Sequence, residues 1–131
     1  MMDDYYDLGP YSRAITTRSA EAQLWFTRGL NWCYAFHHEE ALRCFKKVVE
    51  HDPDCAMGYW GIAYAVGPYY NIPWEKMSPS GQAAALELTY ENSQQAIALS
   101  EKASPVEAAL CHAFAAPVSY THLTLPTILR V

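Results

Sequence analysis

Residues 22–53 constrain the fold of this chain more than any other stretch, because small and aromatic residues recur there at helical spacing. Small residues let two antiparallel helices approach closely, aromatic residues fill the space between them, and proline stops a helix because it lacks the backbone N–H. The positions that carry the pattern are Trp25, Gly29, Trp32, Ala41, Phe45 and Pro53. This spacing predicts a helix-turn-helix unit that repeats about every 34 residues.

The spaced pattern resembles the tetratricopeptide repeat. The resemblance implies an all-α fold, a right-handed tetratricopeptide-like α-solenoid of antiparallel helix pairs, with about two and a half repeats in this chain. Two positions depart from the repeat: Arg28 stands where leucine is usual and Val48 where alanine is usual. Residues 36–41 and 52–74 are also similar to a fungal and bacterial subfamily of such proteins. Its members are mostly described only as repeat-containing, so this similarity implies a fold and almost no activity.

The residue pattern divides the chain into three parts: an irregular N-terminal arm at 1–18, a helical repeat domain at 19–116 and a tail at 117–131. The arm is expected to be extended and to pack through Tyr11 or Ile15. Helices are expected over residues 20–36, 39–51, 56–66 and 79–102, and a fifth begins at Pro105. Serines at 19, 78 and 104 are the predicted N-caps, and Glu107 completes a capping box with the last of them.

The tail does not continue the helical pattern. Residues 118–127 resemble the in-frame translation of a transposon-end adapter used in sequencing libraries, so we expect this stretch to be non-native. The native domain would then be truncated near Ala116, as part of a longer protein. The alternative is a genuine irregular tail. A truncated array leaves the apolar face around Leu110, Ala113 and Phe114 uncovered, which predicts marginal stability or self-association of residues 1–116 through the uncapped C-terminal helix.

The chain is acidic, with 14 Asp and Glu against 9 Lys and Arg. Nucleic acids and anionic membranes bind basic surfaces, so neither is an expected partner. The N-terminus carries no secretory signal and no apolar run is long enough to cross a bilayer, which favours a cytoplasmic location. The cysteines lack zinc-binding spacing and are interpreted as small buried hydrophobic residues: Cys33, Cys44, Cys55 and Cys111.

In the repeat that this chain resembles, the first helix of each pair lines a concave groove. By that register the groove residues are Phe26, Leu30, Tyr34, Met57, Trp60 and Tyr64, with Gln23 and Cys33 beside them. We expect this aromatic groove to bind a protein or peptide partner through a hydrophobic or helical segment. The alternative is that some of these residues pack against the next repeat or against residues 68–77. A clamp for a terminal carboxylate is not expected, because Phe26 and Leu30 replace its polar residues.

Residues 68–77 are longer than a repeat turn and form a candidate functional or capping loop, with Tyr69, Tyr70, Asn71 and Trp74 as its candidate contacts. An alternative function is therefore an enzyme or a protein binding a small ligand or metal in a pocket between the groove and this loop, near His38. No catalytic residue, metal-ligand set or cofactor is predicted. His38 lacks the second histidine of a zinc-protease motif and is predicted to bond backbone groups at a turn.

Overall fold

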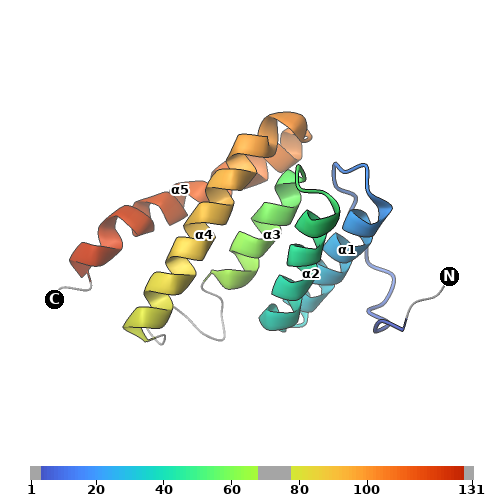
Figure 1. Ribbon diagram of the computed structural model, residues 1–131, viewed down its shortest axis with the longest axis horizontal. Helices are drawn as coiled ribbons and strands as arrows, with labels where there is room; N and C mark the ends of the chain where they lie inside the picture. The colour runs from blue at the N-terminus through green and yellow to red at the C-terminus, as the bar shows by residue number, and fades with distance from the viewer. Residues whose placement is uncertain (1–3, 68–77, 129–131) are drawn as a thin grey trace.

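The computed structural model describes residues 4–67 and 78–128, and the regular elements in them are helices. In chain order they are α1 (Ala20–Tyr34), α2 (His38–His51), α3 (Ala56–Val66), α4 (Pro79–Leu99), the short 3-10 helix η2 (Ser100–Lys102) and α5 (Pro105–Ile128). Each α-helix packs against the next one, and α3 also contacts α1 and α5 (Figure 1). The predicted all-α fold of consecutive helix pairs is confirmed.

Side-chain caps fix the starts of three helices where the sequence predicts them. The hydroxyl of Ser19 accepts a hydrogen bond from the backbone N–H of Ala22, and that of Ser78 accepts one from Gly81. At the start of α5 the capping box forms as predicted: Glu107 N–H donates to the Ser104 hydroxyl, and Ser104 N–H donates to the Glu107 carboxylate. These bonds satisfy backbone donors that a helix start leaves open.

The turn between α1 and α2 begins earlier than the sequence predicts. Phe36 has a φ of 60°, its N–H donates to the carbonyl of Cys33, and the N–H of His37 donates to the carbonyl of Trp32. This is a Schellman motif, which ends α1 at Tyr34 rather than at Phe36. The predicted first helix is therefore two residues too long, because a left-handed residue cannot continue a right-handed helix.

Replacing Phe36 by glycine is expected to stabilise the protein. A left-handed residue with a side chain costs about 1–2 kcal/mol, and glycine avoids most of that cost. The Phe36 ring is 62% exposed, so little burial is lost. We expect Phe36→Gly to raise the midpoint of urea unfolding, followed by circular dichroism, while the control Phe36→Ala keeps the strained backbone and gains less. Equal midpoints for the two variants would contradict this account of the turn.

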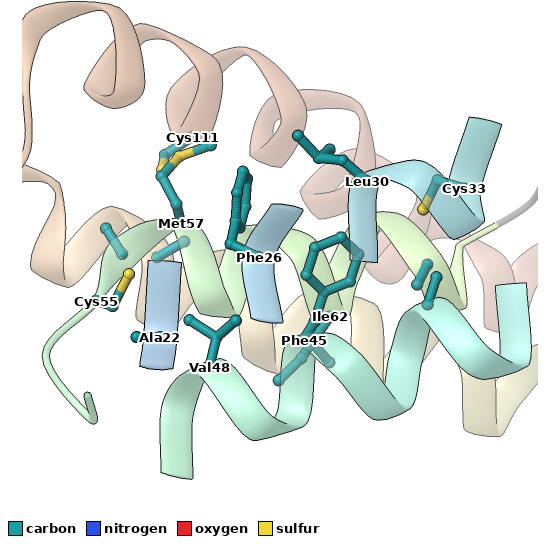
Figure 2. Close-up of a cluster of buried hydrophobic side chains, with 14 residues drawn as sticks. Ala22, Phe26, Leu30, Cys33, Phe45, Val48, Cys55, Met57, Ile62 and Cys111 are labelled. Atoms are coloured by element: carbon teal, nitrogen blue, oxygen red, sulfur yellow. The ribbon is translucent and has the colours of Figure 1, made fainter. Parts of the chain in front are cut away.

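The hydrophobic core is organised around Phe45 of α2. Its ring lies 5.6 Å from that of Phe26, and neither residue is exposed (Figure 2). Glycines on the two flanking helices face the ring: a Cβ built on Gly29 of α1 would lie 2.5 Å from it, and one built on Gly61 of α3 would lie 2.4 Å away. Both positions must therefore stay glycine for α1 and α3 to approach α2 this closely.

Gly61→Ala should destabilise the fold, because the added methyl group overlaps the Phe45 ring. Overpacking of this kind costs about 1–3 kcal/mol. We expect a matching loss in the free energy of unfolding measured by urea denaturation. A double-mutant cycle supplies the control: in a Phe45→Leu background the smaller side chain leaves room, so the added cost of Gly61→Ala should shrink. Strict additivity of the two changes would argue against a direct clash.

The four cysteines are free thiols and are buried, as predicted. Burial raises the pKa of Cys55 and of Cys111 to about 11, and the same effect raises the pKa of Cys33 to about 12. A thiol with a raised pKa carries little of the reactive thiolate at neutral pH. These cysteines therefore serve packing rather than chemistry.

The N-terminal arm lies extended against α1 and is held through its backbone. The side-chain amide of Asn31 donates to the carbonyl of Tyr11 at 3.2 Å, and that of Gln23 donates to the carbonyl of Arg13 at 2.8 Å. In return the backbone N–H of Ile15 donates to the Gln23 side-chain oxygen at 2.9 Å. Over residues 4–18 the arm is irregular, and it contacts α1 at both positions that the sequence analysis offered as alternatives, Tyr11 and Ile15.

Helix α5 does not end near Ala116 as predicted but continues to Ile128. The backbone of 117–128 is thus helical, which corrects the expectation of an irregular tail there. The prediction rested on the β-branched residues and the proline within 118–127, but one proline removes one hydrogen bond at a cost of about 3 kcal/mol and need not unwind the residues around it. The origin of residues 118–127 is a separate matter and stays a prediction.

Candidate partner-binding face

The six predicted groove residues separate into a buried and an accessible group. Phe26, Leu30 and Met57 are 0%, 4% and 2% exposed, respectively, and belong to the hydrophobic core. They hold the helices together and offer no surface to a partner. This agrees with the alternative stated above, in which some of the groove residues pack inside the protein. By contrast, Tyr34 is 58% exposed and Tyr64 is 40% exposed. Only the outer edge of the predicted groove is thus available for binding.

Three rings from two helices form what we call the aromatic cluster: Trp60 and Tyr64 of α3, and Phe114 of α5. Trp60 and Tyr64 are stacked, with ring centroids 5.1 Å apart and planes at 14°. Phe114 lies 6.4 Å from Trp60 and 6.3 Å from Tyr64, at steep angles to both. The four-residue spacing on α3 puts the first two rings on one side of the helix, and the contact of α5 with α3 supplies the third.

A separate pair of rings lies on α1 and the arm. Tyr34 meets Tyr11 of the arm edge to face, with centroids 5.5 Å apart. A hydrogen bond with Tyr11 raises the pKa of Tyr34, burial and the hydroxyl groups of Tyr11 and Tyr64 act in the same direction, and the charge of Arg13 opposes them. Tyr11 and Phe114 were not among the predicted groove residues. That prediction used only the first helix of each of the first two pairs, whereas Tyr11 lies in the N-terminal arm and Phe114 in α5.

The face around Leu110, Ala113 and Phe114 is partly covered within this chain. Phe114 packs on the aromatic cluster, Leu110 packs against the core, and their neighbours Cys111 and Ala115 are buried. Ala113 is exposed. Helices α3 and α4 of this chain therefore cover part of the apolar face of α5.

Trp60 of the aromatic cluster is half-buried. Its indole N–H is buried and has no hydrogen-bond acceptor among the described residues. The predicted loop contacts, Tyr69, Tyr70, Asn71 and Trp74, lie outside those residues, and so does the predicted pocket between groove and loop. Of the rings described above, Tyr11, Tyr34 and Tyr64 are exposed, whereas Trp60 and Phe114 are half-buried.

The histidines at the α1–α2 turn serve the backbone. His37 Nδ1 accepts a hydrogen bond from the N–H of Glu40, which caps α2. Burial lowers the pKa of His38, opposed by a hydrogen bond with the Phe36 backbone and reinforced by the proximity of His37. His38 thus bonds a backbone group at the turn, as predicted. Across 4–67 and 78–128, no three His, Cys, Asp or Glu side chains gather in a way that could hold a metal ion.

A cavity of about 550 Å³ opens between the start of α1, the α2–α3 turn and the end of α4. Its walls are Thr16, Thr17, Arg18, Asp52, Asp54, Ala56, Leu99, Lys102 and Ala103. The lining therefore mixes two basic with two acidic side chains, and the Thr17 hydroxyl donates to the carboxylate of Asp52. Such a balance suits water or a small polar molecule.

Beside this cavity, Glu107 joins the arm to α5. It is 5% exposed, and its carboxylate accepts hydrogen bonds from the N–H and hydroxyl of Thr16 and from the N–H of Ser104. Burial acts to raise the pKa of Glu107, but the hydrogen bonds from Thr16 and Ser104 outweigh it and lower the pKa below its ordinary value. The ionised carboxylate is therefore the form that stabilises the fold.

Glu107→Gln should destabilise the protein at neutral pH, because an amide N–H₂ would then face the donors of Thr16 or Ser104. Leaving such a group unsatisfied costs about 1–3 kcal/mol. A carboxylate with a lowered pKa contributes its stability above the pKa of the unfolded chain, and loses it as the pH falls through the folded value. Urea unfolding should thus show a gap between wild type and variant at pH 7 that narrows in acid below about pH 4. Glu101→Gln, an exposed change on η2, is the control and should show no such gap.

Comparison with known protein families finds one match: residues 22–55 fit the family model of the tetratricopeptide repeat. These residues comprise most of α1 and all of α2, with the Phe45 ring between them. No match is found among curated proteins or among solved structures. Within the described part of the chain, no helix has both the length and the apolar character needed to cross a membrane.

Proposed function

We propose that this chain is a non-catalytic interaction module that binds a protein or peptide partner through the aromatic cluster and Tyr34. Tetratricopeptide repeats generally mediate protein binding, and residues 22–55 match that repeat. The single observation that carries the proposal is the stacked pair of Trp60 and Tyr64, which leaves Tyr64 40% exposed beside Phe114. Clustered exposed rings are uncommon on a surface that has no partner.

The chemistry of this surface indicates the partner. Aromatic rings bury much area with little loss of side-chain freedom, and they accept apolar or aromatic groups in offset or edge-to-face contact. Tyrosine hydroxyls at the edge add hydrogen bonds to a peptide backbone. We therefore propose a hydrophobic or amphipathic peptide segment as the ligand, with no cofactor. The acidic net charge of −5 makes a nucleic acid an unsuitable one.

The test is to select peptides that bind the full chain from a displayed library and to measure their affinities for variants by calorimetry. Tyr64→Ala and Tyr34→Ala are expected to weaken the selected peptides by roughly tenfold or more, because each removes an exposed ring of the binding surface. Both residues are exposed, so the fold should survive, which circular dichroism would verify.

Val106→Ala is the matched control, because Val106 is a 58% exposed apolar residue of α5 that lies outside the aromatic cluster. It should leave the affinities unchanged. If peptides bind equally well to Tyr64→Ala, Tyr34→Ala and the control, the aromatic cluster is not the binding surface. Self-association through α5 remains part of the proposal, and light scattering over a range of concentrations would detect it.

A further inference from the structure

The side chain of Tyr5 fills a pocket built by α1 and α2. Its ring meets Trp25 edge to face at 5.2 Å, and the guanidinium of Arg28 lies 4.1 Å from the ring centre. The indole N–H of Trp32 donates to the phenol oxygen at 2.6 Å, and the phenol donates to Glu40 Oε1 at 3.1 Å. Both the ring and the hydroxyl of Tyr5 are therefore recognised. We call this the phenol pocket.

The walls of the phenol pocket are held in place by their own contacts. Arg28 is only 9% exposed and lies between two rings, since its guanidinium is also 4.5 Å from the centre of the Trp25 ring. The carboxylate of Glu40 bonds Tyr5 through one oxygen and Arg43 through the other. Trp25, Arg28 and Trp32 share one side of α1 by their spacing. The pocket is thus a feature of the α1–α2 pair and not of the arm that occupies it.

The pocket selects a neutral phenol. A phenylalanine would leave the indole N–H of Trp32 and the carboxylate of Glu40 without their partner, and buried unsatisfied groups are costly. A phosphotyrosine would bring two negative charges against Glu40. Burial and the proximity of Cys44, whose sulfur is 3.2 Å from the phenol oxygen, raise the pKa of Tyr5, so the hydroxyl stays protonated and can donate.

Cationic groups stand against the rings of the pocket. The guanidinium of Arg28 lies over the Tyr5 ring, and the ammonium group of Lys47 lies 5.9 Å from the centre of the Trp25 ring, which forms one wall of the pocket. Helix α2 as a whole carries as many acidic as basic residues, and two of its basic side chains are paired, Arg43 with Glu40 at 3.2 Å and Lys47 with Glu50 at 3.8 Å. The pocket therefore favours an electron-rich aromatic ring.

We propose that the phenol pocket is a second binding site, which takes a tyrosine side chain of a partner protein, and that Tyr5 occupies it in cis. The arm is tethered beside the pocket, so its effective concentration there is high and a partner must compete with it. This site is separate from the aromatic cluster, because none of its walls belongs to α3 or α5.

A labelled peptide with the sequence of residues 1–10 serves as the probe, and fluorescence anisotropy measures its binding to the full chain. Substitutions that weaken the binding of residue 5 to the pocket should leave the pocket open to the peptide. The affinity of the chain for the labelled peptide should therefore rise from wild type to Tyr5→Phe to Tyr5→Ala, by roughly tenfold or more overall. Against Tyr5→Ala, a peptide with phenylalanine at position 5 should bind roughly tenfold more weakly, and a peptide phosphorylated there should bind more weakly still.

A peptide with phenylalanine at position 6 is the matched control, since Tyr6 is 69% exposed and meets Trp32 only through its ring. It should bind like the parent peptide. The Tyr5→Phe chain keeps the ring in the pocket, so it tests the proposal even if Tyr5→Ala fails to fold. Equal affinities for all three chains, or no binding to folded Tyr5→Phe and Tyr5→Ala, would overturn the proposal. A wild-type dimer that Tyr5→Ala abolishes in light scattering would also overturn it, because the occupant would then be a second copy's arm.

Discussion

The contact of Phe45 with two glycines sets the spacing on which the rest of the structure depends. One aromatic ring from α2 lies against the bare backbone of α1 at Gly29 and of α3 at Gly61. Without side chains at those positions, three helices can share a single ring as their common centre. Residues 22–55, which match the tetratricopeptide repeat, include Gly29 and Phe45, and the burial of Phe26 and Val48 follows from this close approach.

Function at the surface follows from the same geometry. Because α2 draws α1 and α3 together, and α5 then packs on α3, residues from helices far apart in the sequence meet along one face. On each of these helices, side chains that point toward the neighbouring helices are buried in the core, and side chains on the adjacent part of the helix surface stay accessible to solvent. Phe26 and Tyr64 illustrate the division: both belong to the same predicted register, yet one is fully buried and the other is substantially exposed.

The sequence predicts the helices of this chain well, and the accessibility of its candidate residues poorly. Caps and hydrophobic spacing are local signals, so Ser19, Ser78 and Ser104 could be identified without a structure. The burial of the Leu30 and Met57 side chains depends on how closely neighbouring helices approach, and no local sequence pattern encodes that distance. Arg28 is instructive. It departs from the repeat because its guanidinium stacks on Tyr5, and an irregular arm has no periodicity from which that contact could be inferred.

The arm also changes how the ends of the array behave. It contacts α1 and α2 through Tyr5 and reaches α5 through the bond between Thr16 and Glu107. Linear repeat arrays tend to fray from their ends, since each terminal unit has only one neighbour. Here the irregular N-terminal arm contacts both the first helix pair and the start of α5. We therefore expect α1, α2 and α5 to unfold in one cooperative step rather than in succession.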